Sequence, residues 1–240
     1  PNGDGREVKF KPDIKQSILI IEDNFEMRNY LLSMFNHSFH CFTAENGELG
    51  IESALEHIPS LIICDVMMPK SDGFTVANKL KSNELTCHIP IILLTAKGDS
   101  QSRIYGWQQH VDDYIAKPFN QPELVSRVNN LLTVRTLLKE KFGSLLGQSN
   151  PISLLHHSGF SQKDRDFISR FENVIEENYQ RPEFKRTDAA NLMTISERQL
   201  NRKPSAMVDH NFSEYLRKFR LRQARLLIGT QLQVAEVADK

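Results

Sequence analysis

Five polar residues in the first half of the chain each stand at the end of a short apolar run: Glu22, Asp23, Asp65, Thr95 and Lys117. Such runs are typical of buried parallel strands, whose carboxyl ends meet at one edge of a sheet. Three carboxylates gathered there would repel one another unless a cation lay between them, and oxygen ligands favour Mg²⁺. A carboxylate, Mg²⁺, an ammonium group and a hydroxyl together provide what phosphoryl transfer to an aspartate requires.

The elements that would position these residues alternate between short apolar strands and amphipathic helices. We expect strands at residues 17–21, 39–43, 61–64, 89–94 and 113–116, and helices at 25–35, 47–57, 74–81, 100–109 and 121–139. This alternation predicts an α/β fold with a doubly wound, five-stranded parallel sheet. Ligands of such sheets bind outside the carboxyl ends of the strands, where the five polar residues are expected.

The motifs that carry these residues resemble those of response-regulator receiver domains, over residues 16–135. They are Ile21-Glu22-Asp23, Asp65-Val66-Met67-Met68-Pro69, Asp72-Gly73, Thr95-Ala96 and Tyr114-Ile115-Ala116-Lys117-Pro118-Phe119. The resemblance implies a flavodoxin-like receiver fold. The peptide bond at the position of Lys117–Pro118 is often cis in this family, so the resemblance implies a cis bond here.

The same resemblance implies a role for each matching residue. Asp65 would accept a phosphoryl group from a histidine kinase, and Lys117 would contact that group. Thr95 and Tyr114 would form a switch pair that responds to it. The ligands of Mg²⁺ would be Asp23, Asp65, the backbone carbonyl of Met67 and, more weakly or through water, Glu22.

The second half of the chain has only helical periodicity. We expect helices at 187–193, 197–208 and 214–228, with Ser196 and Ser213 as N-caps of the last two. The tight turn at 194–196 between two short helices suggests a helix-turn-helix unit. Between Ser196 and Leu226 there are eight basic and three acidic residues. Such clustering favours contact with a phosphate backbone, although a solvated charged face is the alternative.

This half resembles AraC-type DNA-binding domains at Ala190, Ser196–Lys203, Tyr215–Arg217 and Arg220–Leu227. The resemblance places a first recognition helix from Glu197, with Arg198, Gln199 and Arg202 as candidates for contact with DNA. Pro204 departs from the family pattern and is expected to kink or end that helix, at a cost of ~3 kcal/mol. A second unit would start at Val234–Ala238 and be incomplete, so we expect the helical part to be poorly packed.

Composition and length fit a small all-α domain after the receiver. We assign 1–15 as a linker, 16–140 as the receiver, 141–163 as a second linker and 164–240 as the incomplete DNA-binding domain. The three cysteines have no ligand-like spacing, which favours a reducing cytoplasm. No apolar run is long enough to cross a bilayer, and no membrane contact is expected. Because the chain begins with Pro1 rather than Met, we expect it to be part of a longer polypeptide.

Together these expectations predict that the protein is a two-component response regulator rather than an enzyme. A histidine kinase, in trans or in the same polypeptide, would phosphorylate Asp65 with Mg²⁺, and the second domain would control transcription, with a homodimer as the candidate assembly. One alternative is a phosphate sink or protein-docking receiver with a non-functional output domain. Another is a Mg²⁺-dependent phosphatase, which is disfavoured because Met67 stands where a second aspartate would serve as general acid.

Overall fold

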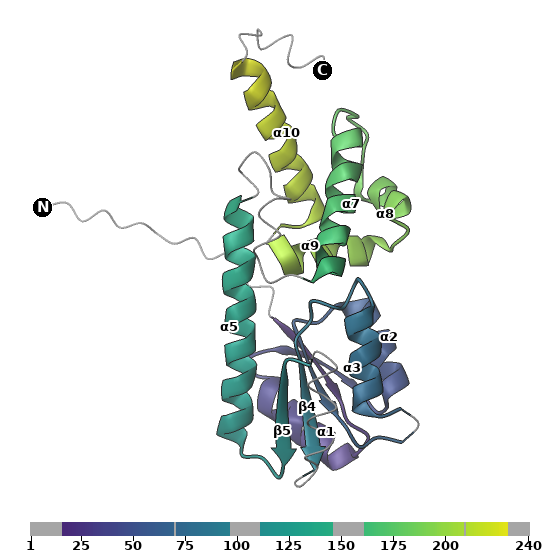
Figure 1. The fold of residues 1–240 in the computed structure, drawn as a ribbon, viewed down its shortest axis with the longest axis vertical. Coiled ribbons are helices and arrows are strands. Elements are labelled where there is room, and N and C mark those ends of the chain that lie inside the picture. Colours follow the sequence, from purple (N-terminus) through teal and green to yellow (C-terminus); the bar gives the residue numbers. More distant parts are fainter. Residues whose placement is uncertain (1–15, 70, 97–110, 146–160, 209, 230–240) are drawn as a thin grey trace, which may run out of the picture.

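The first half of the chain forms one parallel sheet, with strand order β2-β1-β3-β4-β5. The structure, a computed structural model, describes residues 16–69, 71–96, 111–145, 161–208 and 210–229 (Figure 1). The strands are β1 (Ser17–Ile21), β2 (His40–Ala44), β3 (Leu61–Asp65), β4 (Ile91–Ala96) and β5 (Asp113–Lys117). All neighbouring strands pair in parallel, as the alternating pattern predicts. The flavodoxin-like receiver fold is therefore confirmed.

Helices cover both faces of this sheet. They are α1 (Phe25–Phe35), α2 (Gly47–His57), α3 (Gly73–Ser82) and α5 (Gln121–Leu145). Residues of α1 and α5 pack on the face that carries Ile18 and Ile63, and residues of α2 and α3 pack on the face that carries Leu19 and Ile62. The helix expected at 100–109 lies outside the described residues. Helix α5 continues to Leu145, past its expected end at 139.

The second half contains α7 (Gln162–Asn178), α8 (Arg186–Met193), α9 (Glu197–Val208) and α10 (Phe212–Gly229). Their apolar sides form one buried cluster in which Phe171 makes edge contacts with Phe212 and Tyr215, at centroid distances of 6.4 and 5.0 Å. The expectation of poor packing is therefore wrong for the described helices. The expected second unit at 234–238 lies outside the described residues.

Two local expectations in this half are corrected. Helix α9 neither ends nor breaks at Pro204, because Pro204 is buried beside Leu200 and Met207 and this packing offsets the missing backbone hydrogen bond. The N-cap of α10 is Asn211 rather than Ser213: its Oδ1 accepts from the amide of Glu214 at 3.0 Å, and its own amide donates to Glu214 Oε2 at 3.2 Å. Ser196 caps α9 as predicted.

The helical half lies at one end of the sheet. In Figure 1 the arrows of β4 and β5 point away from α7–α10, so these helices pack at the amino-terminal edge of the sheet. Helix α9 contacts α2 and α5 of the first half. The edge that carries the five polar residues is therefore the opposite one, free of this contact.

Candidate functional site

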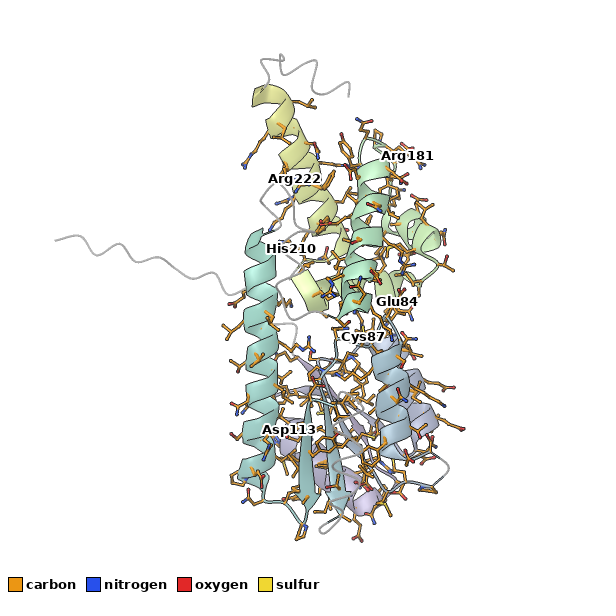
Figure 2. The ribbon with its side chains drawn as sticks, in the orientation of Figure 1. Glu84, Cys87, Asp113, Arg181, His210 and Arg222 are labelled. Carbon is orange, nitrogen blue, oxygen red and sulfur yellow. The ribbon has the colours of Figure 1, made fainter. Side chains whose placement is uncertain are left out.

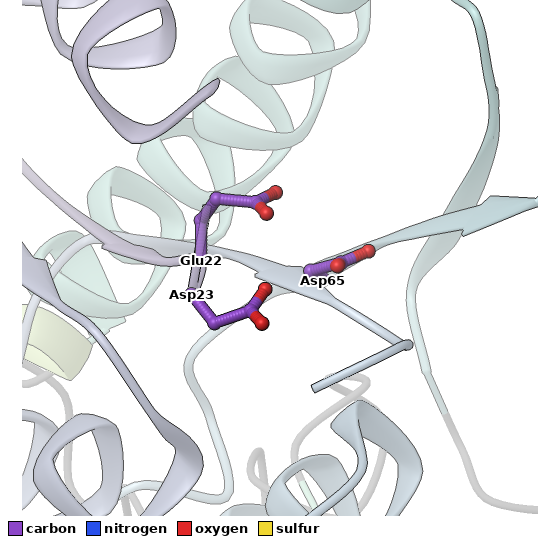
Figure 3. Close-up of side chains that lie close together, drawn as sticks. All are labelled: Glu22, Asp23 and Asp65. Atoms are coloured by element: carbon purple, nitrogen blue, oxygen red, sulfur yellow. The ribbon is translucent and has the colours of Figure 1, made fainter. Parts of the chain in front are cut away.

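The carboxylates of Glu22, Asp23 and Asp65 converge at the carboxyl ends of β1 and β3 (Figure 3). One ligand oxygen from each lies within 4.8 Å of the others. Glu22 and Asp65 are buried, at 1% and 5% exposure, while Asp23 is exposed. The three carboxylates line a cleft of about 590 Å³ with Asn24, Glu26, Met27, Tyr30 and Lys117. An all-oxygen donor set of this kind fits a hard divalent cation such as Mg²⁺.

Lys117 bridges two of these acids from the end of β5. Its Nζ lies 2.8 Å from Glu22 Oε2 and 2.9 Å from Asp65 Oδ1. Burial alone would lower the pKa of Lys117, but its bonds to the two carboxylates raise it above its ordinary value. Burial raises the pKa of Glu22 even though Lys117 opposes that shift. The ammonium group is therefore stabilised in its charged form, whereas burial disfavours the charged form of Glu22, and a second cation would reduce that free-energy cost.

The turn after β1 is fixed by two residues that the sequence argument missed. The side chain of Asn24 accepts from the amide of Met27 at 2.9 Å and caps α1, and the amide of Asn24 donates to Glu22 Oε1. Arg28 donates to the carbonyl oxygens of Glu22 and Asp23 at 2.6 and 3.2 Å. An asparagine directly before an amphipathic run is a recognisable N-cap signal, whereas nothing in the sequence marks Arg28.

The loop after β3 is equally constrained. Asp72 caps α3 by accepting from the amide of Thr75 at 2.6 Å. Gly73 follows, and a Cβ at this position would lie 2.3 Å from the carbonyl oxygen of Asp65. The Asp72-Gly73 pair thus allows α3 to start directly against the acidic edge. Met67 lies in this loop with a side chain that is 68% exposed.

Thr95 lies near this edge on β4, whereas Tyr114 lies in the first half of the neighbouring strand β5. Thr95 is buried in β4 opposite Ala116 of β5, and Tyr114 is paired with Leu93. The Tyr114 hydroxyl is buried and has no hydrogen-bond partner in the described part of the chain. Burial raises the pKa of this hydroxyl to about 12, so it stays protonated. The Lys117–Pro118 bond is cis, as the resemblance implied.

Residues 18–129 match the family model of the response regulator receiver domain. The matched segment contains strands β2 to β5, all of β1 except Ser17, and all three acids.

This segment is a response regulator receiver domain.

Receiver domains are not enzymes in the usual sense, and they work as part of two-component systems with histidine kinases. The phosphatase alternative therefore has no support.

Relatives of the chain include sensor kinases. Histidine kinase P4 from Formosa agariphila is 29% identical over 225 residues, which are 93% of this chain and 16% of the relative. Sensor histidine kinase TmoS from Ectopseudomonas mendocina is 31% identical over 205 residues, 85% of this chain and 21% of the relative. The chain thus spans only a small part of either protein.

Solved structures similar to the chain include the receiver domain of sensor histidine kinase PA1611 from Pseudomonas aeruginosa. It is 27% identical, and the match covers 50% of this chain and 98% of that chain with a TM-score of 0.47. That structure has a magnesium ion coordinated in its active site cleft.

In the present chain, no helix among the described residues is long and apolar enough to cross a membrane.

The three candidate DNA contacts each bond to the receiver domain, although the Arg198 side chain stays 47% exposed. Arg198 Nη1 is 2.5 Å from Glu56 Oε1, and Gln199 Nε2 donates to the carbonyl oxygen of Leu55 at 3.2 Å. Arg202 donates to the carbonyl oxygen of His57. All three acceptors belong to the last turn of α2, so the predicted recognition helix faces the receiver domain.

Proposed function

We propose that Asp65 is phosphorylated by a histidine kinase in the presence of Mg²⁺ and that the helical half is a DNA-binding output domain of AraC type. The observation that carries the first part is the convergence of Glu22, Asp23 and Asp65 with Lys117. Mg²⁺ would be held by the carboxylates of Asp23 and Asp65, the Met67 carbonyl and, more weakly, Glu22. When bound, it supplies positive charge that neutralises the incoming phosphoryl oxygens.

The residues of the chain then act as follows. A carboxylate oxygen of Asp65 attacks phosphorus, the phosphorus–nitrogen bond of the phosphohistidine breaks, and the departing imidazole takes up a proton. Lys117 moves its hydrogen bonds from the carboxylates to the new phosphoryl group. The hydroxyl of Thr95 donates to the same group, and Tyr114 turns toward the space that Thr95 leaves. The buried, unpartnered hydroxyl of Tyr114 supports such a second position.

The output role is supported by the basic excess of the helical half. The alignment with Histidine kinase P4 covers 93% of this chain and therefore extends beyond the receiver domain. A kinase domain earlier in the same cytoplasmic polypeptide, or a kinase in trans, would supply the phosphoryl group. The output domain would then control transcription, and a homodimer would add avidity for paired sites on DNA.

Acetyl phosphate is the test of the first part, used with and without Mg²⁺ on this chain and on Asp65→Asn. Intact mass and dimer state are measured on the same samples. We expect one added phosphoryl group on the parent chain only, dependent on Mg²⁺, together with a change in association. Failure of the parent to gain mass would contradict the role of Asp65.

A second function has an observation in its favour. Because Arg198, Gln199 and Arg202 contact the receiver domain, the chain could serve as a phosphate sink or protein-docking module whose helical half does not bind DNA. This second function would be favoured if the chain gained a phosphoryl group without any change in association. It would also require that a variant in which α9 no longer contacts α2 fails to bind DNA.

A further inference from the structure

The polar face of α9 is held by the carboxyl end of α2 through three separate contacts. Arg198 pairs with the carboxylate of Glu56, while Gln199 and Arg202 donate to the backbone carbonyls of Leu55 and His57. Helix α2 ends at His57, and its C-cap Ile58 has φ of 44°. The carbonyls of the last turn therefore have no partners farther along the helix and are available to side-chain donors from α9.

The end of α2 presents the same chemistry as a nucleic-acid backbone. Carbonyl oxygens at a helix C-terminus carry partial negative charge, and Glu56 adds a full one. Phosphate contacts in protein–DNA complexes also come largely from arginine and amide side chains that donate to anionic oxygens. The donors of α9 cannot serve both acceptors at once.

A buried polar cluster lies at the centre of this interface. It consists of Cys87 and His88 from the segment before β4, Asp164 of α7 and Lys203 of α9, with exposures of 7, 5, 2 and 0%. Lys203 Nζ is 2.5 Å from Asp164 Oδ1 and 2.9 Å from His88 Nδ1. Because Lys203 can only donate, His88 Nδ1 must accept, which places the imidazole proton on Nε2. Cys87 Sγ donates to Asp164 Oδ1 at 3.2 Å.

Apolar and rim contacts surround this cluster. Leu85 of the receiver domain belongs to the same buried cluster as Phe167 and Phe171 of the helical half. Glu84 and Cys87 lie where the two halves meet (Figure 2), and Glu84 pairs with Arg170 at 2.5 Å. The contact is therefore a desolvated interface between the two halves rather than a single ion pair.

We propose that the end of α2 is an intramolecular competitor for nucleic acid, which closes the output domain by occupying Arg198, Gln199 and Arg202. This inference rests on the proposed DNA-binding function. In the docked state the DNA donors are engaged, and only the fraction of molecules with α9 released binds DNA. The apparent dissociation constant is then the intrinsic one divided by that fraction.

Cys87 offers a readout of docking that does not depend on DNA. Its thiol is buried and contacts Asp164 and Ser161 of the helical half, and burial raises its pKa, so we expect it to react slowly with maleimides while the two halves are docked. Release of α7 and α9 exposes it. Cys64 is fully buried within the sheet, and peptide mass mapping separates Cys41 from Cys87.

The experiment uses the full 240-residue chain with opened and closed variants. Glu56→Lys combined with His88→Ala removes two acceptors on the receiver side and leaves the helical half unchanged. The matched control is Glu52→Lys, which makes the same charge change on an exposed position of α2. The closed variant is Ser161→Cys, because Ser161 Oγ lies 3.6 Å from Cys87 Sγ and a disulfide there would lock the docked state until it is reduced.

The N-ethylmaleimide reaction rate of Cys87 is measured first on the parent, the opened variant and the control. Binding to a labelled random-sequence DNA duplex at low salt is measured next on these chains and on the closed variant. For the opened variant we expect at least ~10-fold faster modification and at least ~10-fold tighter duplex binding than for the parent and the control. Oxidation of the closed variant should abolish duplex binding, and reductant should restore it.

Three results would overturn the inference, each in a distinguishable way. Rapid modification of Cys87 in the parent would mean that the docked state is not populated. Faster modification in the opened variant without tighter duplex binding, while the parent does bind, would mean that docking does not block α9. Absence of duplex binding by every chain, with Cys87 exposed in the opened variant, would refute the proposed DNA-binding function and the inference with it.

Discussion

Lys203 is the most informative single position in the helical half, and we expect Lys203→Met to destabilise that half strongly. The side chain is fully buried, and its ammonium group lies 2.5 Å from Asp164 Oδ1 and 5.6 Å from the centre of the Phe167 ring. Methionine keeps the length and apolar contacts of the lysine stem. The substitution therefore removes mainly the charge, and it leaves the Asp164 carboxylate buried without its cation.

The magnitude follows from the environment of Asp164. Burial alone would raise the pKa of Asp164, but Lys203 and the surrounding hydrogen bonds lower it from an ordinary value of 3.8 to about 2. That shift corresponds to about 2–3 kcal/mol of stability from the paired carboxylate. Removing one partner of a buried ion pair typically costs ~3–5 kcal/mol. Against a usual domain stability of ~5–15 kcal/mol, either loss is large.

The pH dependence has opposite signs in the parent and the variant. In the parent the pKa of Asp164 is lowered, so its stabilising contribution is present above pH 3.8 and is lost as the pH falls toward about 2. In Lys203→Met the lowering effect of the lysine is lost, and burial, the largest single influence, raises the pKa of Asp164 against the smaller opposing effects of His88 and Ser161. The variant should therefore gain stability when the pH falls from 7 to 5, and its deficit relative to the parent should shrink.

Urea unfolding followed by circular dichroism at 222 nm, at pH 7 and pH 5, measures this deficit. The double variant Lys203→Met with Asp164→Leu removes both charges and should recover most of the lost stability. Lys79→Met, at an exposed position of α3, is the control for the chemical change alone. A single variant as stable as the parent, or a double variant no better than the single one, would refute the reasoning.

Four further outcomes follow from the structure. Gly73→Ala should cost at least ~2 kcal/mol in urea unfolding and slow phosphorylation by acetyl phosphate, because the new Cβ would lie 2.3 Å from the Asp65 carbonyl oxygen; normal values for both would contradict that contact. Asn211→Ala should lower stability by ~1 kcal/mol in the same assay, whereas Ser213→Ala should change it little, and equal effects would argue against Asn211 as the cap. Lys117→Met should tighten Mg²⁺ binding in calorimetry at least ~10-fold, since it removes a cation 2.8 and 2.9 Å from two carboxylates, and weaker binding would exclude the proposed metal position. Replacing both Arg198 and Arg202 with alanine in the opened variant should make the slope of log binding constant against log salt concentration shallower by ~2 for duplex binding. An unchanged slope would mean that these side chains do not reach phosphates.

The receiver fold could be predicted from the sequence because each of its elements has a local signal. The runs Ile18–Ile21 and Leu61–Cys64 have the length and apolar character of strands buried on both faces, and both strands form. Parallel pairing then requires their carboxyl ends to meet, so Glu22 and Asp65 converge without any long-range information. The ends of helices are harder to predict from the sequence. Helix α5 runs past its expected end at residue 139 to Leu145, and no proline follows residue 139 until Pro151.

The interface between the two halves could not be predicted from the sequence. Its contacts join Glu56 to Arg198 and His88 to Lys203, which are more than a hundred residues apart, and no periodicity records such a pairing. Pro204 shows a related limit, because the cost of a proline inside a helix predicts a kink or an end of the helix there. Helix α9 nevertheless continues through Pro204 to Val208, with Pro204 buried, and this burial is visible only in three dimensions.

The basic residues of the helical half show why a charge count alone does not identify a binding surface. Eight basic residues against three acidic ones favoured contact with a polyanion, but the count says nothing about how each side chain is used. Lys203 is buried against Asp164, and Arg220 donates to the backbone carbonyls of Tyr179 and Arg181 at 2.8 and 2.7 Å. These two cations stabilise the fold in any state of the chain. Arg198 and Arg202 differ from them, because their partners belong to the receiver domain and are lost when the two halves separate. Separation would therefore return two positive charges to the face of α9, and it is this change, rather than the total charge, that would control binding to DNA.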